Sequence, residues 1–335
     1  MDFELGDIEV AWREKAAALG REVARDAAAA TVVQGAARVG LLDPAIDLLP
    51  LAVACEALAE QSPAAAVILA LHTAVAPAFP RRPAYDGLFR GEMVAAVGLS
   101  SDDMPVEQHG RLSGRAPWVA PITTRGIAVV GTRRSTSSGR PEPVEGRGDA
   151  GRVAYVVSLD APGVTVAPVG TAALAGLVCG HVSFTGAACE PIGATLPIMT
   201  RIRVLIAAAG LGMGRRALRE ALVTARAART AAAGEQTVQG LLADAATELD
   251  AARLMTWKAA GAEPLSLADA SFAKLMATVA AQRAVERATQ VVGVDSFQRG
   301  HIVERLAQDV RALELFAGRT EALRAAAAEE LLPRT

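Results

Sequence analysis

The feature that most constrains the fold is an amphipathic helix near the C-terminus, within residues 286–324. Its apolar residues recur at steps of four, four, three and four, which places them on one face of an α-helix. They are Ile302, Leu306, Val310, Leu313 and Ala317. Gly293 is expected to end the preceding helix, because a residue just past a helix end often needs positive φ and glycine adopts it at little cost.

The composition agrees with a helical chain. The 335 residues are enough for about two domains at roughly 150 residues each. Hydrophobic residues make up 52%, many of them Ala, and aromatic residues only 4%, which favours tightly packed helices over a sheet-dominated fold. The formal charge of −2 gives no electrostatic reason to expect nucleic acid or an anionic membrane as a partner.

The cysteines and the apolar runs indicate a cytoplasmic protein. Three cysteines without a pairing pattern suggest a reducing compartment, in which each packs as a small buried residue. The acidic N-terminus lacks the basic and apolar regions of a signal peptide. Residues 63–79 and 164–184 approach the length of a membrane span but contain Pro or Gly, so no spanning helix is expected.

Three blocks follow one another along the chain. Residues 1–91 are expected to form a helical domain, with helices at 7–30 and 48–60 and a third that Ser62 caps and Pro63 begins. Residues 92–195 contain short runs rich in β-branched residues and predict a small β-domain, within which 135–151 is a surface insertion. Residues 196–335 return to helix.

Two local signals occur in the C-terminal helical block. The "GLGMG" at 210–214 resembles a dinucleotide loop only superficially, since no strand precedes it. We interpret its glycines as points where two helices approach closely. Ser266 or Asp269 is expected to cap a long helix that follows.

The chain resembles the acyl-CoA dehydrogenase family over nearly its whole length. The family's C-terminal motifs, "Q-V-x-G-G-x-G-Y", "V-E-R-x-x-R-D-x-R" and "E-G-T-x-x-I-x-R", correspond here to "QVVGVDSF", "VERLAQDVR" and "AGRTEALR". The resemblance implies a mostly helical α+β fold: an N-terminal helical domain, a small middle β-domain and a C-terminal four-helix-type bundle. It also implies an oxidoreductase of lipid metabolism that desaturates an acyl-CoA thioester and passes a hydride to FAD.

The residue at the family's usual base position differs. The Glu of "E-G-T", which removes the α-proton in the family, corresponds to Ala317, and a methyl group cannot accept a proton. Glu314, nearly one turn earlier, is expected to be a solvated side chain. Glu220 is a weak candidate for a base on the first helix of the C-terminal domain, and its alternative is an exposed partner of Arg216.

The resemblance also implies a set of FAD contacts that is only partly retained. The matching residues are Ser100, Trp118, Arg229, Gln236, Gln290 and Gly293. Trp118 retains the aromatic plane beside the flavin, and Arg229 matches a guanidinium that reaches the pyrophosphate from a neighbouring subunit. The alternative for Trp118 is a core aromatic of the β-domain. The alternative for Arg229 is a surface charge on an arginine-rich helix. His72, His109, His181 and His301 show no metal-ligand spacing, so no metal site is predicted.

Three interpretations of function remain open. The first is a flavoprotein subunit with an impaired site, or one that a partner completes in a homo- or heteromeric dimer or tetramer of such subunits. If active, it would reduce an electron-transfer flavoprotein. The second is a non-catalytic structural or regulatory homologue. The third is a flavin-dependent monooxygenase of the same superfamily, which needs no α-proton base.

Overall fold

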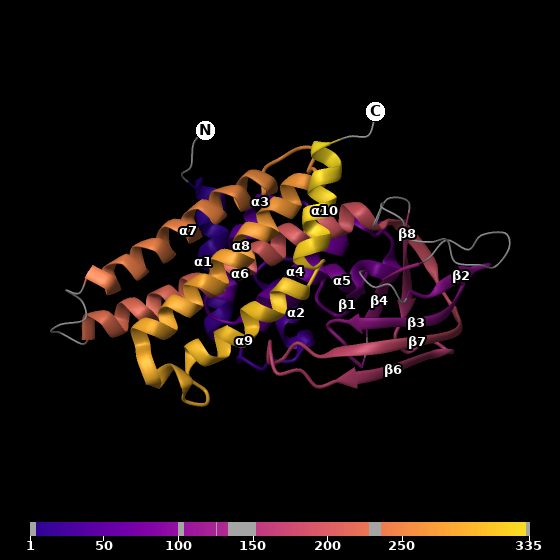
Figure 1. Ribbon diagram of the computed structural model, residues 1–335. Helices are drawn as coiled ribbons and strands as arrows, with labels where there is room; N and C mark the ends of the chain where they lie inside the picture. Colours follow the sequence, from indigo (N-terminus) through magenta and orange to yellow (C-terminus); the bar gives the residue numbers. More distant parts are fainter. Residues whose placement is uncertain (1–4, 100–103, 125, 133–151, 228–235, 333–335) are drawn as a thin grey trace.

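The chain folds as helices, then strands, then helices again. The computed structural model describes residues 5–99, 104–124, 126–132, 152–227 and 236–332. Helices extend to Phe89, strands run from Val94 to Ala194, and helices resume at Thr195. Figure 1 shows the helices as one elongated body with the strands gathered at one end. The predicted fold class is confirmed, whereas the predicted insertion at 135–151 lies outside the described residues.

From residue 5 onward, where the structure describes the chain, the N-terminal block contains five α-helices. They are α1 (Asp7–Glu22), α2 (Ala29–Arg38), α3 (Leu48–Ala59), α4 (Pro63–Val75) and α5 (Asp86–Phe89). The prediction of one helix over 7–30 was wrong, because the backbone becomes extended at Val23 and a separate helix follows. The segment between the two contacts the β-domain: a Cβ on Gly176 would lie 2.9 Å from the Ala27 carbonyl oxygen.

The start of α4 confirms only half of the predicted cap. Pro63 occupies the first helical turn, where its missing N–H costs nothing. Ser62 precedes it, but its hydroxyl makes no capping hydrogen bond. Every residue of α4 is buried, so packing against other elements stabilises this helix.

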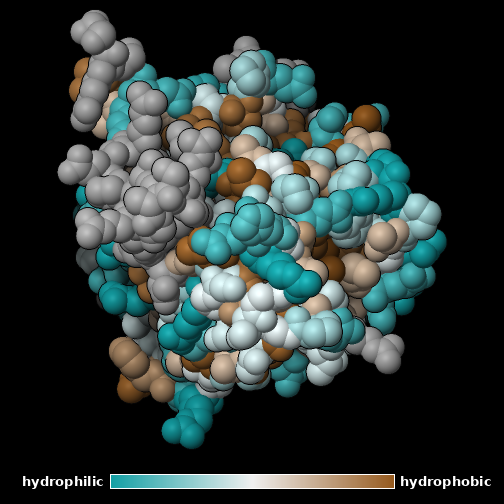
Figure 2. All heavy atoms as spheres, turned by 90° about the vertical axis from the view of Figure 1, so that its right-hand side faces the viewer, coloured by the Kyte–Doolittle hydropathy of each residue, from teal (hydrophilic) through white to brown (hydrophobic). Residues whose placement is uncertain are grey.

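Two four-stranded sheets form the β-domain. The strands are β1 (Val94–Gly98), β2 (Val106–Gln108), β3 (Arg111–Val119), β4 (Gly126–Gly131), β5 (Val153–Ser158), β6 (Val164–Val169), β7 (Cys179–Ala188) and β8 (Glu190–Ala194). One sheet has the order β1-β4-β5-β8 and the other β2-β3-β7-β6. Side chains from both sheets, such as Val130 and Phe184, share a buried core. The outer side shows polar and apolar residues intermixed (Figure 2).

The C-terminal block is a helical bundle. It contains α6 (Thr195–Ala227), α7 (Gln236–Ala260), α8 (Leu267–Val292), α9 (Ile302–Leu315) and α10 (Thr320–Leu331), with a short 3₁₀ helix, η4 (Gly293–Phe297). Helix α6 is long and apolar enough to cross a membrane, but 83% of its most apolar window is buried inside the protein. It is the central helix of the core and packs against α3, α4, α7, α8 and α9.

The glycines of α6 are sites of close helix contact, as predicted. A Cβ on Gly212 would lie 2.1 Å from the Glu56 carbonyl oxygen on α3. A Cβ on Gly214 would lie 3.0 Å from the Cα of Ala281 on α8. At Gly212 the nearest atom belongs to backbone, so no side-chain movement would relieve the clash; at Gly214 the Leu249 Cδ2 is nearer still, at 2.6 Å.

The ends of the later helices explain where sequence patterns succeed. Ser266 caps α8, accepting a hydrogen bond from the Asp269 N–H at 2.9 Å. Gly293 ends α8 with φ of 74°, as predicted. The apolar stripe of α9 is also present, but Ala317 is not part of that helix: it lies in the following turn with φ of 57°. Ala317 therefore follows Leu313 at a helical spacing by coincidence, because the chain forms a turn at position 317.

Candidate active site

Trp118 presents its indole ring on the surface of the β-domain. Its side chain belongs to β3 and is 59% exposed, so the alternative of a core aromatic was wrong. The pairing of β3 with β7 shifts register between Ala116 and Val119, and Trp118 has φ of 55°. Such an irregularity re-aims side chains out of their regular alternation.

His181 lies beside this ring and has an unused polar atom. The two rings meet edge to face with centroids 5.6 Å apart. The His181 Nδ1 is buried and has no hydrogen-bond partner among the described residues. A buried polar atom without a partner is unfavourable, so this exposed aromatic surface carries a free hydrogen-bonding position next to it.

The remaining predicted cofactor residues lie elsewhere. Ser100 and Arg229 fall outside the described residues. Gln236 begins α7 and is exposed, Gln290 is exposed near the end of α8, and Gly293 follows it. Arg283 pairs with Glu248, whereas Arg287, one turn later on α8, also reaches Asp244, one turn earlier on α7, so the two helices run antiparallel here. The start of α7 and the end of α8 are therefore at the same end of the bundle.

One chain does not bring these two groups together. Strand β3 lies at the right in Figure 1, whereas η4, directly after Gly293, lies at the lower left. Trp118 therefore lies in the β-domain, whereas Gln236, Gln290 and Gly293 lie at the end of the bundle away from the strands. The residues predicted to contact the cofactor thus form two groups that are separated within one chain.

Buried cations hold the turn between α9 and α10, which contains Ala317. The Lys274 Nζ donates to the carbonyl oxygens of Glu314 at 3.0 Å and Gly318 at 2.5 Å. The Arg203 Nε donates to the Ala317 carbonyl at 3.1 Å, and its Nη1 donates to the Ser271 hydroxyl at 3.3 Å. Burial, together with the nearby Arg203 charge, lowers the pKa of Lys274 to about 7.

Neither Glu314 nor Glu220 places a free carboxylate at this turn. Glu314 is half-buried and accepts hydrogen bonds from Gln282 and Thr320, both at 3.1 Å, so the expected solvated side chain was wrong. Glu220 pairs with Arg216 at 3.7 Å. It follows Arg203 by 17 positions on α6, which corresponds to about 25 Å along the helix axis.

Asp309 connects the bundle to the β-domain. Its carboxylate accepts a hydrogen bond at 2.5 Å from the N–H of Leu174, in the connection between β6 and β7. Burial raises the pKa of Asp309 to about 6, and the Leu174 hydrogen bond offsets part of that rise. The side chain is therefore a contact between domains, with no role in proton abstraction at the turn.

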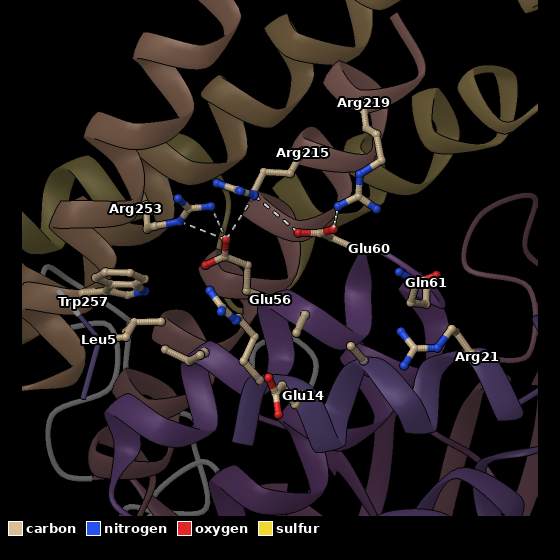
Figure 3. Close-up of a pocket in the computed structure, with 14 residues that line it drawn as sticks. Leu5, Glu14, Arg21, Glu56, Glu60, Gln61, Arg215, Arg219, Arg253 and Trp257 are labelled. Atoms are coloured by element: carbon tan, nitrogen blue, oxygen red, sulfur yellow. Dashed lines mark hydrogen bonds and ion pairs between the residues drawn. The ribbon is translucent and has the colours of Figure 1, made fainter. Parts of the chain in front are cut away.

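A separate charged cavity lies between α1, α3, α6 and α7, with a volume of about 390 Å³ (Figure 3). We call it the arginine pocket. Its lining includes Arg13, Glu14, Arg21, Glu56, Glu60, Arg215, Arg219, Arg253 and Trp257. The sequence analysis did not predict it, although a charged Glu56 within the apolar run "LLPLAVACEALA" was a usable signal.

Glu56 of α3 and Glu60, the residue directly after this helix, bind the arginines at the inner wall of the arginine pocket. Glu56 accepts from the Nε of Arg253 at 2.9 Å and from its Nη2 at 2.5 Å. Glu60 accepts from Arg215 at 3.3 Å and also from Arg219. Burial raises the pKa of Glu56, while Arg253 acts in the opposite direction. Figure 3 shows these guanidinium groups converging on the two carboxylates.

Comparisons with known proteins identify the fold and its relatives. Residues 194–332 match the model for the acyl-CoA dehydrogenase C-terminal domain. Probable acyl-CoA dehydrogenase YngJ of Bacillus subtilis is 33% identical over 136 residues, a match that spans 39% of this chain and 36% of that protein. The matched region is thus about a third of the relative's length.

Two solved structures share the fold over the whole chain. Butyryl-CoA dehydrogenase from Megasphaera elsdenii is 19% identical with a TM-score of 0.83, covering 99% of this chain and 100% of that one. PigA with FAD and proline is 19% identical with a TM-score of 0.84, covering 99% of each chain. The chain therefore has the acyl-CoA dehydrogenase fold, and its C-terminal part matches the C-terminal domain of that family.

Proposed function

We propose that this chain is a flavoprotein subunit of the acyl-CoA dehydrogenase type that binds FAD between two subunits. The supporting observation is the separation of Trp118 from Gln236, Gln290 and Gly293 within one chain. A second chain placed with its bundle end against this β-domain would join the two halves. The exposed indole and the partnerless His181 Nδ1 fit a flat, polar-edged ring such as a flavin.

The residues of this chain would bind and orient rather than abstract a proton. When bound, FAD supplies the hydride acceptor. Trp118 offers a face for stacking, and the exposed Gln236 and Gln290 offer amide groups for the far side of the cofactor. The turn at Ala317 supplies no base, because its methyl side chain has no titratable group. A partner subunit with a carboxylate at its own turn would therefore complete the α,β-desaturation of an acyl-CoA.

A reaction that needs no base at this turn is the second candidate. The PigA structure shows that a protein of this fold was solved with FAD and proline, which is not a thioester. A flavin-dependent oxidation that uses O₂ would leave Ala317 without a required role. Its substrate would then occupy the same surface near Trp118.

The test begins with the flavin content and mass of the purified chain. We expect a yellow oligomer whose FAD is lost when Trp118→Ala is introduced, since base–aromatic stacking is worth about 1–3 kcal/mol. Desaturation of an acyl-CoA with an artificial electron acceptor should be weak for the chain alone and strong with a Glu-containing homologue. A monomer that gains no flavin absorbance when FAD is added would contradict the proposal.

Ala317→Glu separates an impaired dehydrogenase from the second candidate. A positioned base contributes roughly 10²–10⁴-fold, so the variant should gain desaturase activity of about that order. Ala317→Gln is the matched control, since it has nearly the same size and cannot accept the proton. Equal activity of both variants would show that the turn does not face a thioester.

A further inference from the structure

The arginine pocket is a second candidate binding site, away from the β-domain. Its walls come from α1 and α3 of the N-terminal block and from α6 and α7 of the C-terminal bundle. In Figure 1 the labels α1 and α7 lie on the side opposite the strands. The volume of about 390 Å³ falls within the range of about 300–1,000 Å³ typical of small-molecule sites.

The charge of the lining favours an anion. Five arginines and three glutamates line the pocket, and Asp250 beside it pairs with two of the arginines, so positive charges exceed negative ones by one. The inner arginines, Arg215, Arg219 and Arg253, are paired with Glu56, Glu60 and Asp250. Each guanidinium has five N–H donors, so these ion pairs leave further donors on the arginine side chains.

The excess charge comes from one face of α1. Arg13, Ala17 and Arg21 follow one another at four-residue steps and all line the pocket. Neither Arg13 nor Arg21 forms an ion pair with another residue in the part of the chain that the structure describes. Figure 3 shows Arg21 across the pocket from Arg219, beside Gln61.

Trp257 provides a flat apolar wall at the other side. It lies on α7, is half-buried, and the Arg253 guanidinium carbon is 5.6 Å from its ring centroid. A cavity that combines separated guanidinium groups with an aromatic wall suits a ligand with several oxyanion groups on a small organic frame.

We propose that the arginine pocket binds a small organic polyanion with at least two phosphate or carboxylate groups. The ligand joins Arg13 and Arg21 of α1 to the arginines of α6 and α7. Because its contacts come from both helical blocks, binding stabilises their association and not the β-domain. This site is independent of the flavin.

The experiment uses the full chain and three probes at constant ionic strength: pyrophosphate, citrate and ADP. Thermal unfolding and calorimetry measure binding. The probe with the highest affinity shows whether the pocket prefers phosphate or carboxylate groups. We expect at least one probe to raise the Tm by several degrees. Arg13→Gln and Arg21→Gln should each weaken that probe about tenfold, because a charge-assisted hydrogen bond contributes about that factor.

The controls distinguish specific binding from general charge effects. Arg324→Gln removes an exposed arginine of α10, which does not line the pocket, and should bind as the unmodified chain does. Arg13 and Arg21 are exposed, so the unliganded variants should melt within a degree or two of the parent. Binding that is absent for all three probes, or unchanged in both α1 variants, would overturn the proposal. Flavin content is measured separately, so its loss would not affect this conclusion.

Discussion

At the scale of single residues, Lys274 and Arg203 stabilise the turn that contains Ala317 by hydrogen bonds to its carbonyl oxygens. Lys274 is fully buried and Arg203 is 5% exposed, and both donate to carbonyl oxygens of residues 314–318. These carbonyls belong to the last turn of α9 and to the residues directly after it. The helix dipole favours positive charge at this end of a helix. The two side chains therefore fix the turn that presents Ala317, whatever group stands at that position.

The pKa of Lys274 predicts a pH dependence of stability. The unfolded chain keeps this proton up to about pH 10.5, whereas the folded chain releases it near pH 7. Between these values the unfolded state binds more protons, so the free energy of unfolding rises with pH. Relative to Lys274→Met, the parent should gain up to about 1.4 kcal/mol per pH unit from pH 7 to 10. Urea unfolding at several pH values measures this, and parallel curves for the two proteins would refute it.

His72 predicts the behaviour at low pH. Its Nδ1 accepts from the Ala95 N–H at 3.2 Å, so the Nε2 carries the proton and donates to the Leu88 carbonyl at 3.0 Å. Burial lowers its pKa from 6.5 to about 4. The unfolded state therefore binds the extra proton first, and stability should fall as the pH drops from 6.5 to 4.

The change His72→Asn should remove this loss of stability and lower the stability at pH 7. A buried donor or acceptor without a partner costs about 1–3 kcal/mol. His109→Asn, in an exposed turn, is the control and should leave the acid unfolding curve unchanged. If His72→Asn loses stability between pH 6.5 and 4 as steeply as the parent, the buried neutral imidazole is not its source.

At the scale of elements, the close approach of α6 to its neighbours depends on residues without side chains. Helix α6 contacts α3 through Gly212 and α8 through Gly214. Glycine lowers the intrinsic stability of a helix by about 1 kcal/mol relative to alanine, so its presence here is a packing requirement. The buried area that the close contact permits offsets this cost.

Gly212→Ala and Gly240→Ala should change stability in opposite directions. The new Cβ at position 212 would overlap the Glu56 carbonyl oxygen of α3. We expect this overlap to lower the free energy of unfolding by about 1–3 kcal/mol, the usual cost of overpacking. Gly240 lies within α7 with no atom within 4 Å of a new Cβ, so alanine there should stabilise by about 0.5–1 kcal/mol. Denaturant midpoints measure both. A neutral Gly212→Ala would mean that α3 and α6 move apart at little cost.

At the scale of the whole molecule, the proposed flavin site between two subunits predicts an oligomer. If Trp118 of one chain and Gln290 of another bind one flavin, each half-site variant alone should lose FAD. Mixing Trp118→Ala with Gln290→Ala subunits should restore part of the flavin, since a mixed dimer contains one intact site. Flavin absorbance of the mixture, compared with each variant alone, measures this. No recovery in a mixture that forms dimers would place the whole site within one chain.

Patterns along the chain predicted what local physics controls. The helix–strand–helix order, the end of α8 at Gly293, the cap at Ser266 and the tight contacts at Gly212 and Gly214 all follow from periodicity or from glycine's lack of a side chain. Predictions that depended on distant contacts were less successful. The sequence did not predict that α1 ends at Glu22, before a segment that contacts Gly176 of the β-domain, or that Glu314 accepts a hydrogen bond from Gln282 of α8.

The sequence by itself determined the order of helices, strands and helices and the methyl group at position 317, because these depend on residue types at fixed spacings. Only the tertiary structure decided that Trp118 is exposed, that Glu220 is far from the turn, and that arginines from α6 and α7 meet Glu56 beside two arginines of α1. Residues as far apart as 13 and 253 become neighbours through helix packing. That packing depends on the side-chain volumes of four helices at once, so no local sequence pattern predicts it.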